Sequence, residues 1–218
     1  MPEPLDQPDR RLPIPPEILA GRVIAIGRWL EASSIMHVAD GLVAGGVRAF
    51  EVTLDSPDAI IAIGALAKRH SGGSLLVGAG TVLDVASATA AAEAGARFLV
   101  SPHTDVELVR WAAAKGIPIF PGALTPSEIL AAWRAGASAV KLFPASAVGP
   151  SYVREIRGPL AEVPLIPTGG VTAENAAAFI AAGAVGVGVG SWLFAGGSPD
   201  LIRQRATQLI SAVRSARH

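Results

Sequence analysis

Short apolar runs, many of them rich in β-branched residues, alternate along the chain with alanine-rich stretches of helical length. The runs are apolar at nearly every position, which is typical of parallel strands that are covered on both faces. We predict strands at residues 23–26, 47–53, 74–78, 97–100, 117–120, 138–142, 163–166 and 185–189. We predict helices near residues 33–44, 57–70, 84–94, 104–114, 125–135, 150–157, 172–182 and 199–215.

Strands that alternate with helices indicate crossover connections, and eight such units predict a single-domain α/β fold, the (β/α)8 TIM barrel. The length of 218 residues fits one undivided barrel. An open doubly wound sheet is the structural alternative. Residues 1–16 are rich in proline and charge, so we expect a flexible, exposed N-terminal arm there and the barrel domain in residues 17–218.

The amino-acid composition argues against nucleic-acid binding, thiol chemistry and a metal site. Lysine plus arginine and aspartate plus glutamate both number 18, so no net charge attracts nucleic acid or an anionic membrane. The absence of cysteine excludes disulfides and thiolate chemistry, and the four histidines lack metal-ligand spacing. We therefore expect no metal and no other cofactor. The chain also lacks a signal region and an apolar run of ~18 residues, which predicts a cytoplasmic protein.

Active sites of such barrels lie at the C-terminal ends of the strands. Polar, charged or glycine residues recur at the predicted ends, namely Arg28, Glu51, residues 80–81, 101–102 and 121–122, Lys141, and residues 168–170 and 190–191. This recurrence predicts a functional site at that end of the barrel.

Lys141 has an unusual setting for a lysine. Lys68 and Lys115 fall at predicted helix ends, where a cation is ordinary, whereas Lys141 lies inside the apolar run AVKLFP. If Val140 faces the helices, strand alternation directs Lys141 into the barrel mouth. Desolvation there lowers the pKa of the amine, and a neutral amine can attack a ketone to form an imine. The alternative is a structural lysine paired with a carboxylate.

Glu51 lies in the apolar run AFEVTL, and buried carboxylates are rare unless they are paired. If it faces the barrel interior, its natural partner is Lys141. One positioned carboxylate can transfer the protons of imine formation, dehydration and carbon–carbon cleavage. The alternative is a salt bridge that serves only to close the barrel.

The last two predicted strands end in PTGGV and GVGSW, where such barrels often bind phosphate. Backbone N–H groups of Gly169, Gly170 and Gly190 and the Ser191 hydroxyl could bind an anion, although both segments could be simple tight turns. Arg28 could bind a carboxylate in bidentate fashion. Separately, the backbone of residues 78–81 and the Thr81 hydroxyl could hold the keto-acid end. Arg28 could equally be a solvated surface arginine.

Seven segments carry a resemblance to a known family: FEVTL at residues 50–54, VGAGTV at 77–82, SP at 101–102, PG at 121–122, VKLFPA at 140–145, PTGGV at 167–171 and GSWL at 190–193. From about Arg22 to the C-terminus the sequence resembles the 2-keto-3-deoxy-6-phosphogluconate (KDPG) aldolases. This group also includes 4-hydroxy-2-oxoglutarate (KHG) aldolase and the 6-phosphogalactonate enzyme.

The resemblance implies a metal-free class I aldolase, usually a homotrimer, whose partner is a small keto acid or sugar-acid phosphate. It implies that Lys141 is the Schiff-base lysine and Glu51 the proton-transfer residue. It further implies the substrate-binding residues, which are Arg28, Thr81, Pro102, Phe143, Thr168, Gly169, Gly170, Gly190 and Ser191. The expected reaction is the cleavage of a phosphorylated 2-keto-3-deoxy sugar acid to pyruvate and D-glyceraldehyde 3-phosphate.

One position departs from the gluconate-type pattern. Where those enzymes commonly have a substrate-binding arginine, this chain has Asp55, which cannot bind a carboxylate in that way. Arg28 instead matches a first-strand arginine of the galactonate type, so the two C4 epimers stay open as substrates. Three alternatives also stay open: 4-hydroxy-2-oxoglutarate as the main substrate, another phosphate-binding barrel such as an epimerase or thiamin-phosphate synthase, and a non-catalytic sugar-phosphate-binding barrel.

Overall fold

The structure is a computed structural model that describes residues 11–31 and 33–216. The strands are β1 (Val23–Gly27), β2 (Ala49–Thr53), β3 (Leu76–Gly80), β4 (Leu99–Val100), β5 (Ile119–Phe120), β6 (Gly122–Ala123), β7 (Val140–Leu142), β8 (Leu165–Pro167) and β9 (Val187–Val189). The helices are α1 (Pro16–Gly21), α2 (Ile35–Ala44), α3 (Ala59–Arg69), α4 (Val85–Glu93), α5 (Val106–Ala114), α6 (Pro126–Ala135), the 3-10 helix η2 (Ala145–Ala147), α7 (Gly149–Arg157), α8 (Ala173–Ala181), α9 (Ser191–Phe194) and α10 (Pro199–Ser215).

Each predicted strand and each predicted helix has a counterpart in the structure. The strand predicted at residues 117–120 extends as two short strands, β5 and β6, because Pro121 between them cannot donate a ladder hydrogen bond. The sequence pattern did not predict α1, η2 and α9. These helices are too short to show helical periodicity, and α1 begins within the expected arm, with Pro16 in its first turn.

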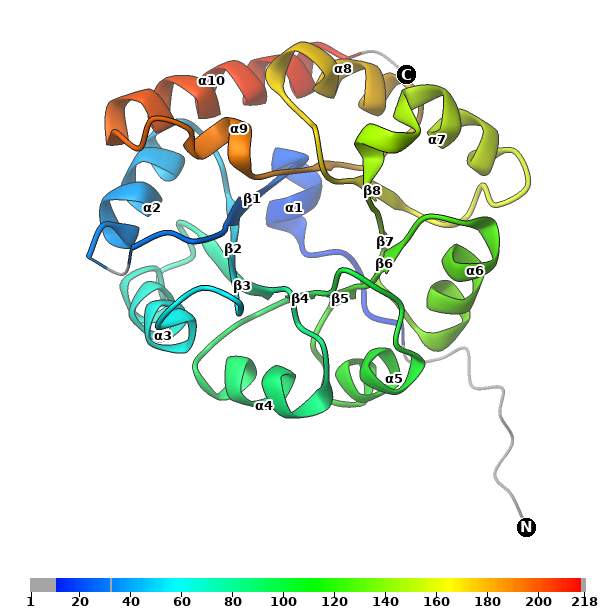
Figure 1. The fold of residues 1–218 in the computed structure, drawn as a ribbon, viewed down its shortest axis with the longest axis horizontal. Helices are drawn as coiled ribbons and strands as arrows, with labels where there is room; N and C mark the ends of the chain where they lie inside the picture. Colours follow the sequence, from blue (N-terminus) through cyan, green and yellow to red (C-terminus); the bar gives the residue numbers. More distant parts are fainter. Residues whose placement is uncertain (1–10, 32, 217–218) are drawn as a thin grey trace.

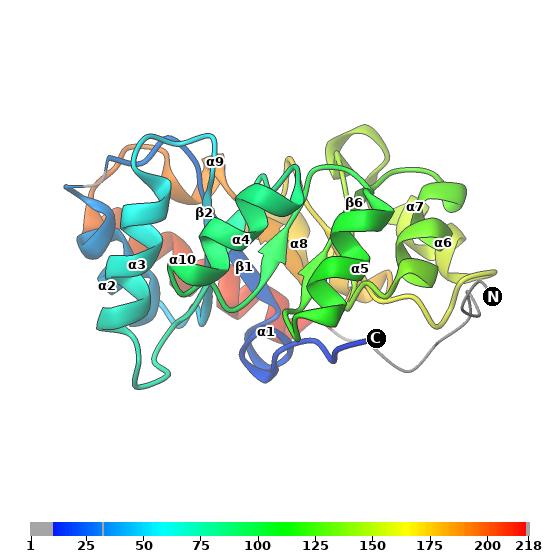
Figure 2. The same cartoon turned by 90° about the horizontal axis from the view of Figure 1, so that it is seen from below.

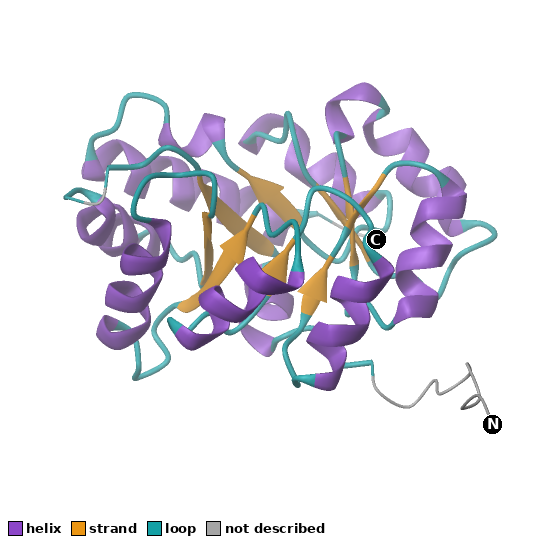
Figure 3. Cartoon of the chain, turned by 60° about the horizontal axis from the view of Figure 1, so that its bottom comes forward, coloured by secondary structure: helices purple, strands orange, loops and turns teal. Residues whose placement is uncertain are grey.

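All strand pairs are parallel, in a sheet of order β5-β4-β3-β2-β1-β9 and a sheet of order β6-β7-β8. Only Pro121 separates β5 from β6 along the chain. At the other edge, Thr168 pairs with Gly188 in a parallel bridge, and the Val185 N–H donates to the Leu165 carbonyl at 3.1 Å. The chain is thus a single-domain α/β fold with a curled parallel sheet inside a ring of helices, which confirms the predicted class at this level (Figures 1 and 3).

Strand residues alternate between two apolar clusters. Phe50 and Val52 face outward and belong to the large cluster beneath the helices, as do Val140 and Leu142. A smaller inner cluster contains Ile24, Phe98, Val100, Phe120 and Ile166, together with residues from the N-terminal segment. The polar residues that alternate with the outward-facing ones therefore point toward the inside of the curled sheet.

The N-terminal segment supplies Ile14 and Ile18 to the inner cluster, where they are 9% and 1% exposed. Figure 1 shows α1 near the centre of the ring of helices, and Figure 2 shows it toward one end of the strands. The expectation of an exposed arm is therefore wrong for Ile14 and Pro15, which are buried, whereas Arg11, Pro13 and Pro16 are exposed. Arg11 also stacks on the ring of Trp133, with its guanidinium 3.3 Å from the ring centroid. Residues 1–10 of the expected arm lie outside the described residues.

Within the described ranges, no helix has the length and apolar character needed to cross a membrane.

Candidate active site

Lys141 is the central residue of β7, and its side chain points inward as the alternation predicted. Its neighbours Val140 and Leu142 pack in the outer cluster, while the Lys141 side chain lines a narrow inner cavity. The residue is 5% exposed. The backbone N–H of Lys141 donates to the Pro121 carbonyl at 2.9 Å, and this hydrogen bond holds β7 beside β6.

Glu51 lines the same cavity from β2, and it is 1% exposed. Within the described part of the chain, neither carboxylate oxygen has a hydrogen-bond partner. One oxygen lies directly against Gly80, where an added Cβ would come within 2.5 Å of it. Glycine at position 80 therefore makes room for the carboxylate.

The cavity brings together polar groups from separate strands. Its polar lining consists of Glu51, Lys141 and the Thr168 hydroxyl, and Gly188 and apolar side chains complete the wall. Thr168 donates to the Ile166 carbonyl at 3.2 Å and contacts Gly188, where an added Cβ would come within 2.3 Å of the hydroxyl oxygen. A small ligand group that enters this cavity meets an amine, a carboxylate and a hydroxyl within apolar walls.

Burial shifts the pKa values of both ionisable groups toward neutrality. Desolvation raises the pKa of Glu51 to about 7, although the charges of Lys141 and Arg28 oppose this rise. Desolvation lowers the pKa of Lys141 below its usual value, opposed by Glu51 and reinforced by Arg28. The two groups titrate as a coupled pair, and burial favours the neutral form of each, so the unprotonated amine of Lys141 is more accessible than that of a solvated lysine.

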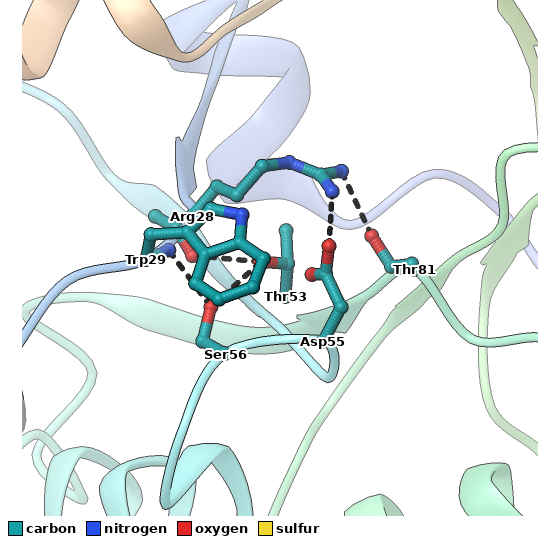
Figure 4. A network of polar contacts seen from close by, with 7 residues as sticks. Arg28, Trp29, Thr53, Asp55, Ser56 and Thr81 are labelled. Carbon is teal, nitrogen blue, oxygen red and sulfur yellow. Dashed lines mark hydrogen bonds and ion pairs between the residues drawn. The ribbon is translucent and has the colours of Figure 1, made fainter.

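Arg28, the first residue after β1, forms a polar network at the mouth of the site (Figure 4). One terminal nitrogen forms an ion pair with the Asp55 carboxylate, and the other donates to the Thr81 hydroxyl at 3.0 Å. Thr81 has a left-handed backbone with φ of 54°, which is uncommon for a residue other than glycine. The sequence had indicated that Asp55 could not bind substrate as arginine does, but not that it pairs with Arg28.

A second set of hydrogen bonds ties the loop after β1 to the loop after β2. The Trp29 N–H donates to the Ser56 hydroxyl at 2.9 Å, and the Ser56 and Thr53 hydroxyls lie 3.0 Å apart. The Thr53 hydroxyl donates to the Gly27 carbonyl at 3.3 Å. The sequence pattern did not predict these contacts, although the hydroxyl-bearing residues Thr53 and Ser56 flank the unusual Asp55.

Residues after β7 and β8 surround the entrance to Lys141. The Lys141 amine lies 4.8 Å from the centroid of the Phe143 ring, and that ring lies against Gly169. Gly169 and Gly170 both have positive φ, 93° and 72°, which favours glycine. An added Cβ at Gly170 would come within 2.7 Å of Ser146, so this loop packs tightly on η2.

The remaining expected site residues, Gly190, Ser191 and Pro102, do not line the inner cavity. Gly190 immediately precedes α9 and Ser191 begins it, beside the end of β1, where the Gly190 backbone lies near Ile26. The Pro102 carbonyl lies against Gly122, where an added Cβ would come within 2.2 Å. Among the described residues, no group of three or more histidine, aspartate and glutamate side chains is arranged to hold a metal ion.

Comparison with known proteins gives a family match over most of the chain. The sequence model of the KDPG and KHG aldolase family matches residues 16–213. A probable 2-dehydro-3-deoxy-6-phosphogalactonate aldolase of Rhizobium meliloti is 40% identical over 204 residues, which are 93% of this chain and 95% of that protein. A 2-dehydro-3-deoxy-phosphogluconate aldolase of Pseudomonas aeruginosa is 39% identical over 172 residues, which are 78% of this chain and 76% of that protein.

A solved structure adds a chemical observation on a relative. It is a KDPG aldolase of Legionella pneumophila, with pyruvate captured at low pH as a covalent carbinolamine intermediate. It superposes with a TM-score of 0.78 at 29% sequence identity and covers 93% of this chain and 97% of its own.

Proposed function

This chain belongs to the KDPG and KHG aldolase family, and on that premise we propose that it cleaves 2-dehydro-3-deoxy-6-phosphogluconate or its galactonate epimer to pyruvate and D-glyceraldehyde 3-phosphate. It is a class I aldolase, a carbon–carbon lyase that works through a lysine Schiff base. The observation that carries the assignment of residues is the placement of Lys141 and Glu51 in the lining of one cavity, at 5% and 1% exposure.

In the first half-reaction, the neutral Lys141 amine attacks C2 of the keto acid and forms a carbinolamine. The protonated Glu51 carboxyl group then donates its proton to the C2 hydroxyl, which leaves as water and gives the protonated imine. The lowered pKa of Lys141 supports this role, because only the unprotonated amine is a nucleophile. The covalent carbinolamine captured in the Legionella relative is the same type of intermediate.

In the cleavage step, Glu51 accepts the proton of the C4 hydroxyl, the C3–C4 bond breaks, and its electron pair moves to the imine nitrogen. D-glyceraldehyde 3-phosphate leaves as the aldehyde and an enamine stays on Lys141. The protonated Glu51 then donates its proton to C3. Addition of water to the protonated imine releases pyruvate and the free amine, and the Glu51 carboxylate accepts the proton that this hydrolysis sets free. A raised pKa of about 7 suits a group that must act as base and then as acid. Such transfer contributes ~10²–10⁴-fold in rate.

The substrate ends have separate binding residues in this proposal. Arg28 and Thr81 bind the carboxylate at the mouth, where their hydrogen bond already brings them together. The phosphate binds at the loops after β8 and β9, through N–H groups of Gly169, Gly170 and Gly190 and the Ser191 hydroxyl. The positive φ of Gly169 and Gly170 supports this because backbone N–H groups can converge on an anion there. Phe143, Thr168 and Pro102 shape the space between the two ends.

We also propose that the curled sheet closes as a full eight-stranded (β/α)8 barrel. Counting β5 and β6 as one strand interrupted at Pro121, and joining the other edges through the Thr168–Gly188 bridge, gives a continuous ring of pairings. The barrel domain would span residues 17–218, with residues 11–16 packed onto its base. A homotrimer belongs to this proposal as well, and a cytoplasmic location stays a prediction.

Trapping with pyruvate and borohydride tests the central assignment. We expect one reduced pyruvyl adduct per chain, located by peptide mass spectrometry on Lys141. Lys141→Arg should abolish the adduct and lower kcat by more than ~10³-fold. Lys68→Arg and Lys115→Arg, at two exposed lysines, are matched controls that should keep the adduct on Lys141 and the wild-type kcat. An adduct on Lys68 or Lys115, or none in the wild type, would overturn the assignment.

A substrate panel tests the chemistry at the phosphate end. It comprises the two C4 epimers and 4-hydroxy-2-oxoglutarate, compared by kcat/KM. We expect either phosphorylated epimer to exceed 4-hydroxy-2-oxoglutarate, and the larger epimer value to identify the preferred configuration. A preference for 4-hydroxy-2-oxoglutarate would contradict a phosphate site at the loops after β8 and β9.

A further inference from the structure

Asp55 occupies a fixed position beside the arginine at the mouth of the site. It lies in a tight turn after β2, in which the Ser56 N–H donates to the Thr53 carbonyl at 3.0 Å. The Leu54 N–H donates to the Gly80 carbonyl at 2.8 Å, which ties the start of this turn to β3. The turn therefore holds the Asp55 carboxylate next to the guanidinium rather than leaving it free to move with solvent (Figure 4).

The guanidinium of Arg28 already uses both terminal nitrogens. One forms the ion pair with Asp55, and the other donates to the Thr81 hydroxyl at 3.0 Å. Bidentate binding of a carboxylate requires two N–H groups of the same guanidinium face. A substrate carboxylate that binds Arg28 end-on, through both terminal nitrogens, must share the nitrogen that Asp55 occupies or displace Asp55 from it. A carboxylate that binds side-on, through Nε and the nitrogen that contacts Thr81, meets the negative charge of Asp55 beside it.

The positive charge of Arg28 also affects the two ionisable groups of the inner cavity. It lowers the pKa of both Glu51 and Lys141, so its field reaches the inner cavity. Asp55 lies in direct contact with Arg28 and carries the opposite charge, so it reduces the net positive charge that an incoming keto acid meets. The side chains of Arg28 and Asp55 are 45% and 32% exposed, and solvent screens their pairing only in part.

We propose, on the basis of the function above, that Asp55 acts as a built-in competitor for Arg28 and thereby sets the affinity of the site for the keto-acid carboxylate. Asp55 touches no reacting atom and acts through Arg28. It weakens the binding of every substrate that presents a carboxylate there, and it affects the imine chemistry at Lys141 less than it affects binding.

Calorimetric titration of the full-length chain with pyruvate tests this proposal. Asp55→Asn keeps a side-chain oxygen that can accept from Arg28 but removes the competing charge. We expect it to lower the apparent Kd for pyruvate about fivefold, which corresponds to about 1 kcal/mol. In steady-state assays KM should fall by a similar factor, while kcat changes less than about twofold.

Asp40→Asn is the matched control. Asp40 pairs with Arg69 on the outer helices, at 2.7 Å and with both side chains 47% exposed, so it is a comparable ion pair away from the site. Its removal should leave the Kd for pyruvate unchanged. Arg28→Gln should raise the Kd at least tenfold, and adding Asp55→Asn to Arg28→Gln should have no further effect.

The outcomes separate this proposal from the proposed function. An unchanged or raised Kd in Asp55→Asn, or an equal effect of Asp55→Asn with and without Arg28, would overturn the competitor role. If the wild type binds pyruvate and the variants change its Kd as expected, but the wild type gives no borohydride adduct, the Schiff-base function alone would be overturned. Wild-type chain that does not bind pyruvate would overturn both.

Discussion

Glu51 has surroundings that differ strongly from those of an ordinary carboxylate. It is almost fully buried, lies against Gly80, and shares its cavity with Lys141. Burial of both groups disfavours both charges, while their mutual attraction favours them, so each group determines how readily the other ionises. A change in the charge of Glu51, the proton-transfer group, therefore changes the fraction of Lys141 that is an unprotonated nucleophile.

Replacement of Glu51 by glutamine tests this coupling. The Glu51 charge raises the pKa of Lys141, so its removal should lower that pKa further. The pH at which trapping by pyruvate and borohydride reaches half its maximal rate should therefore move to lower pH in Glu51→Gln. The overall kcat should fall by ~10²–10⁴-fold because the proton-transfer group is lost.

The readout is the midpoint of the pH profile, which is independent of the loss in rate. Glu93→Gln, on the exposed face of α4, is the control and should leave both the midpoint and kcat unchanged. A midpoint that stays constant or moves to higher pH in Glu51→Gln would contradict the coupling.

The residues of the inner cavity could be predicted from the sequence, whereas the network at the mouth could not. Lys141 and Glu51 are conspicuous because each is a charge within an apolar strand, and alternation determines which way each faces. Asp55 lies in a loop, where no periodicity fixes its direction, so its partner depends on how the loops after β1 and β2 meet. Asp55 stands where the gluconate-type enzymes commonly have an arginine, so the sequence showed that this position is unusual. It did not show that Arg28 is the partner of Asp55.

At the scale of elements, the strands could be predicted because they are buried on both faces, and the long helices because they fill the intervening segments. Short elements escaped the prediction. The helix α1 has six residues, follows a proline-rich segment and resembles an arm in composition. Its role becomes visible only when Ile14 and Ile18 are seen to pack with inward-facing strand residues such as Phe98 and Phe120. A few apolar residues thus decide whether a proline-rich segment packs on the fold.

Truncation of Ile18 tests the importance of α1. Ile18 is 1% exposed and belongs to the same inner cluster as Ile24 and Ile166, which line the cavity. Ile18→Ala should lower the free energy of unfolding by about 2–5 kcal/mol, as measured by urea denaturation. The adjacent Leu19 is 48% exposed, and Leu19→Ala should change it by less than about 0.5 kcal/mol. Equal effects of the two variants would show that α1 does not stabilise the fold.

At the scale of the whole molecule, the two ends of the curled sheet differ. The base is filled by α1, and the opposite end carries the mouth of the site. Among the described residues, six large apolar side chains are exposed at this second end, on loops that follow strands or in the first turns of helices. This apolar rim consists of Trp29, Ile60, Ile61, Leu83, Val106 and Phe143. Exposed apolar side chains gathered at one end are typical of a surface that contacts another chain.

The proposed homotrimer and the apolar rim together give a test at this scale. Light scattering coupled to gel filtration should give the wild type a mass about three times that of the 22.2 kDa chain. Ile61, at 69% exposure, is the most exposed member of the rim, and Ile61→Asp should shift the mass toward that of a monomer, because a buried, unpaired carboxylate destabilises an interface. Leu19→Asp introduces the same charge at the base of the molecule, at an exposed leucine outside the rim, and should leave the mass unchanged. A monomeric wild type would contradict the trimer. A trimer that survives Ile61→Asp but dissociates in Leu19→Asp would place the contact at the base, next to α1, and would leave the mouths of the sites open to solvent.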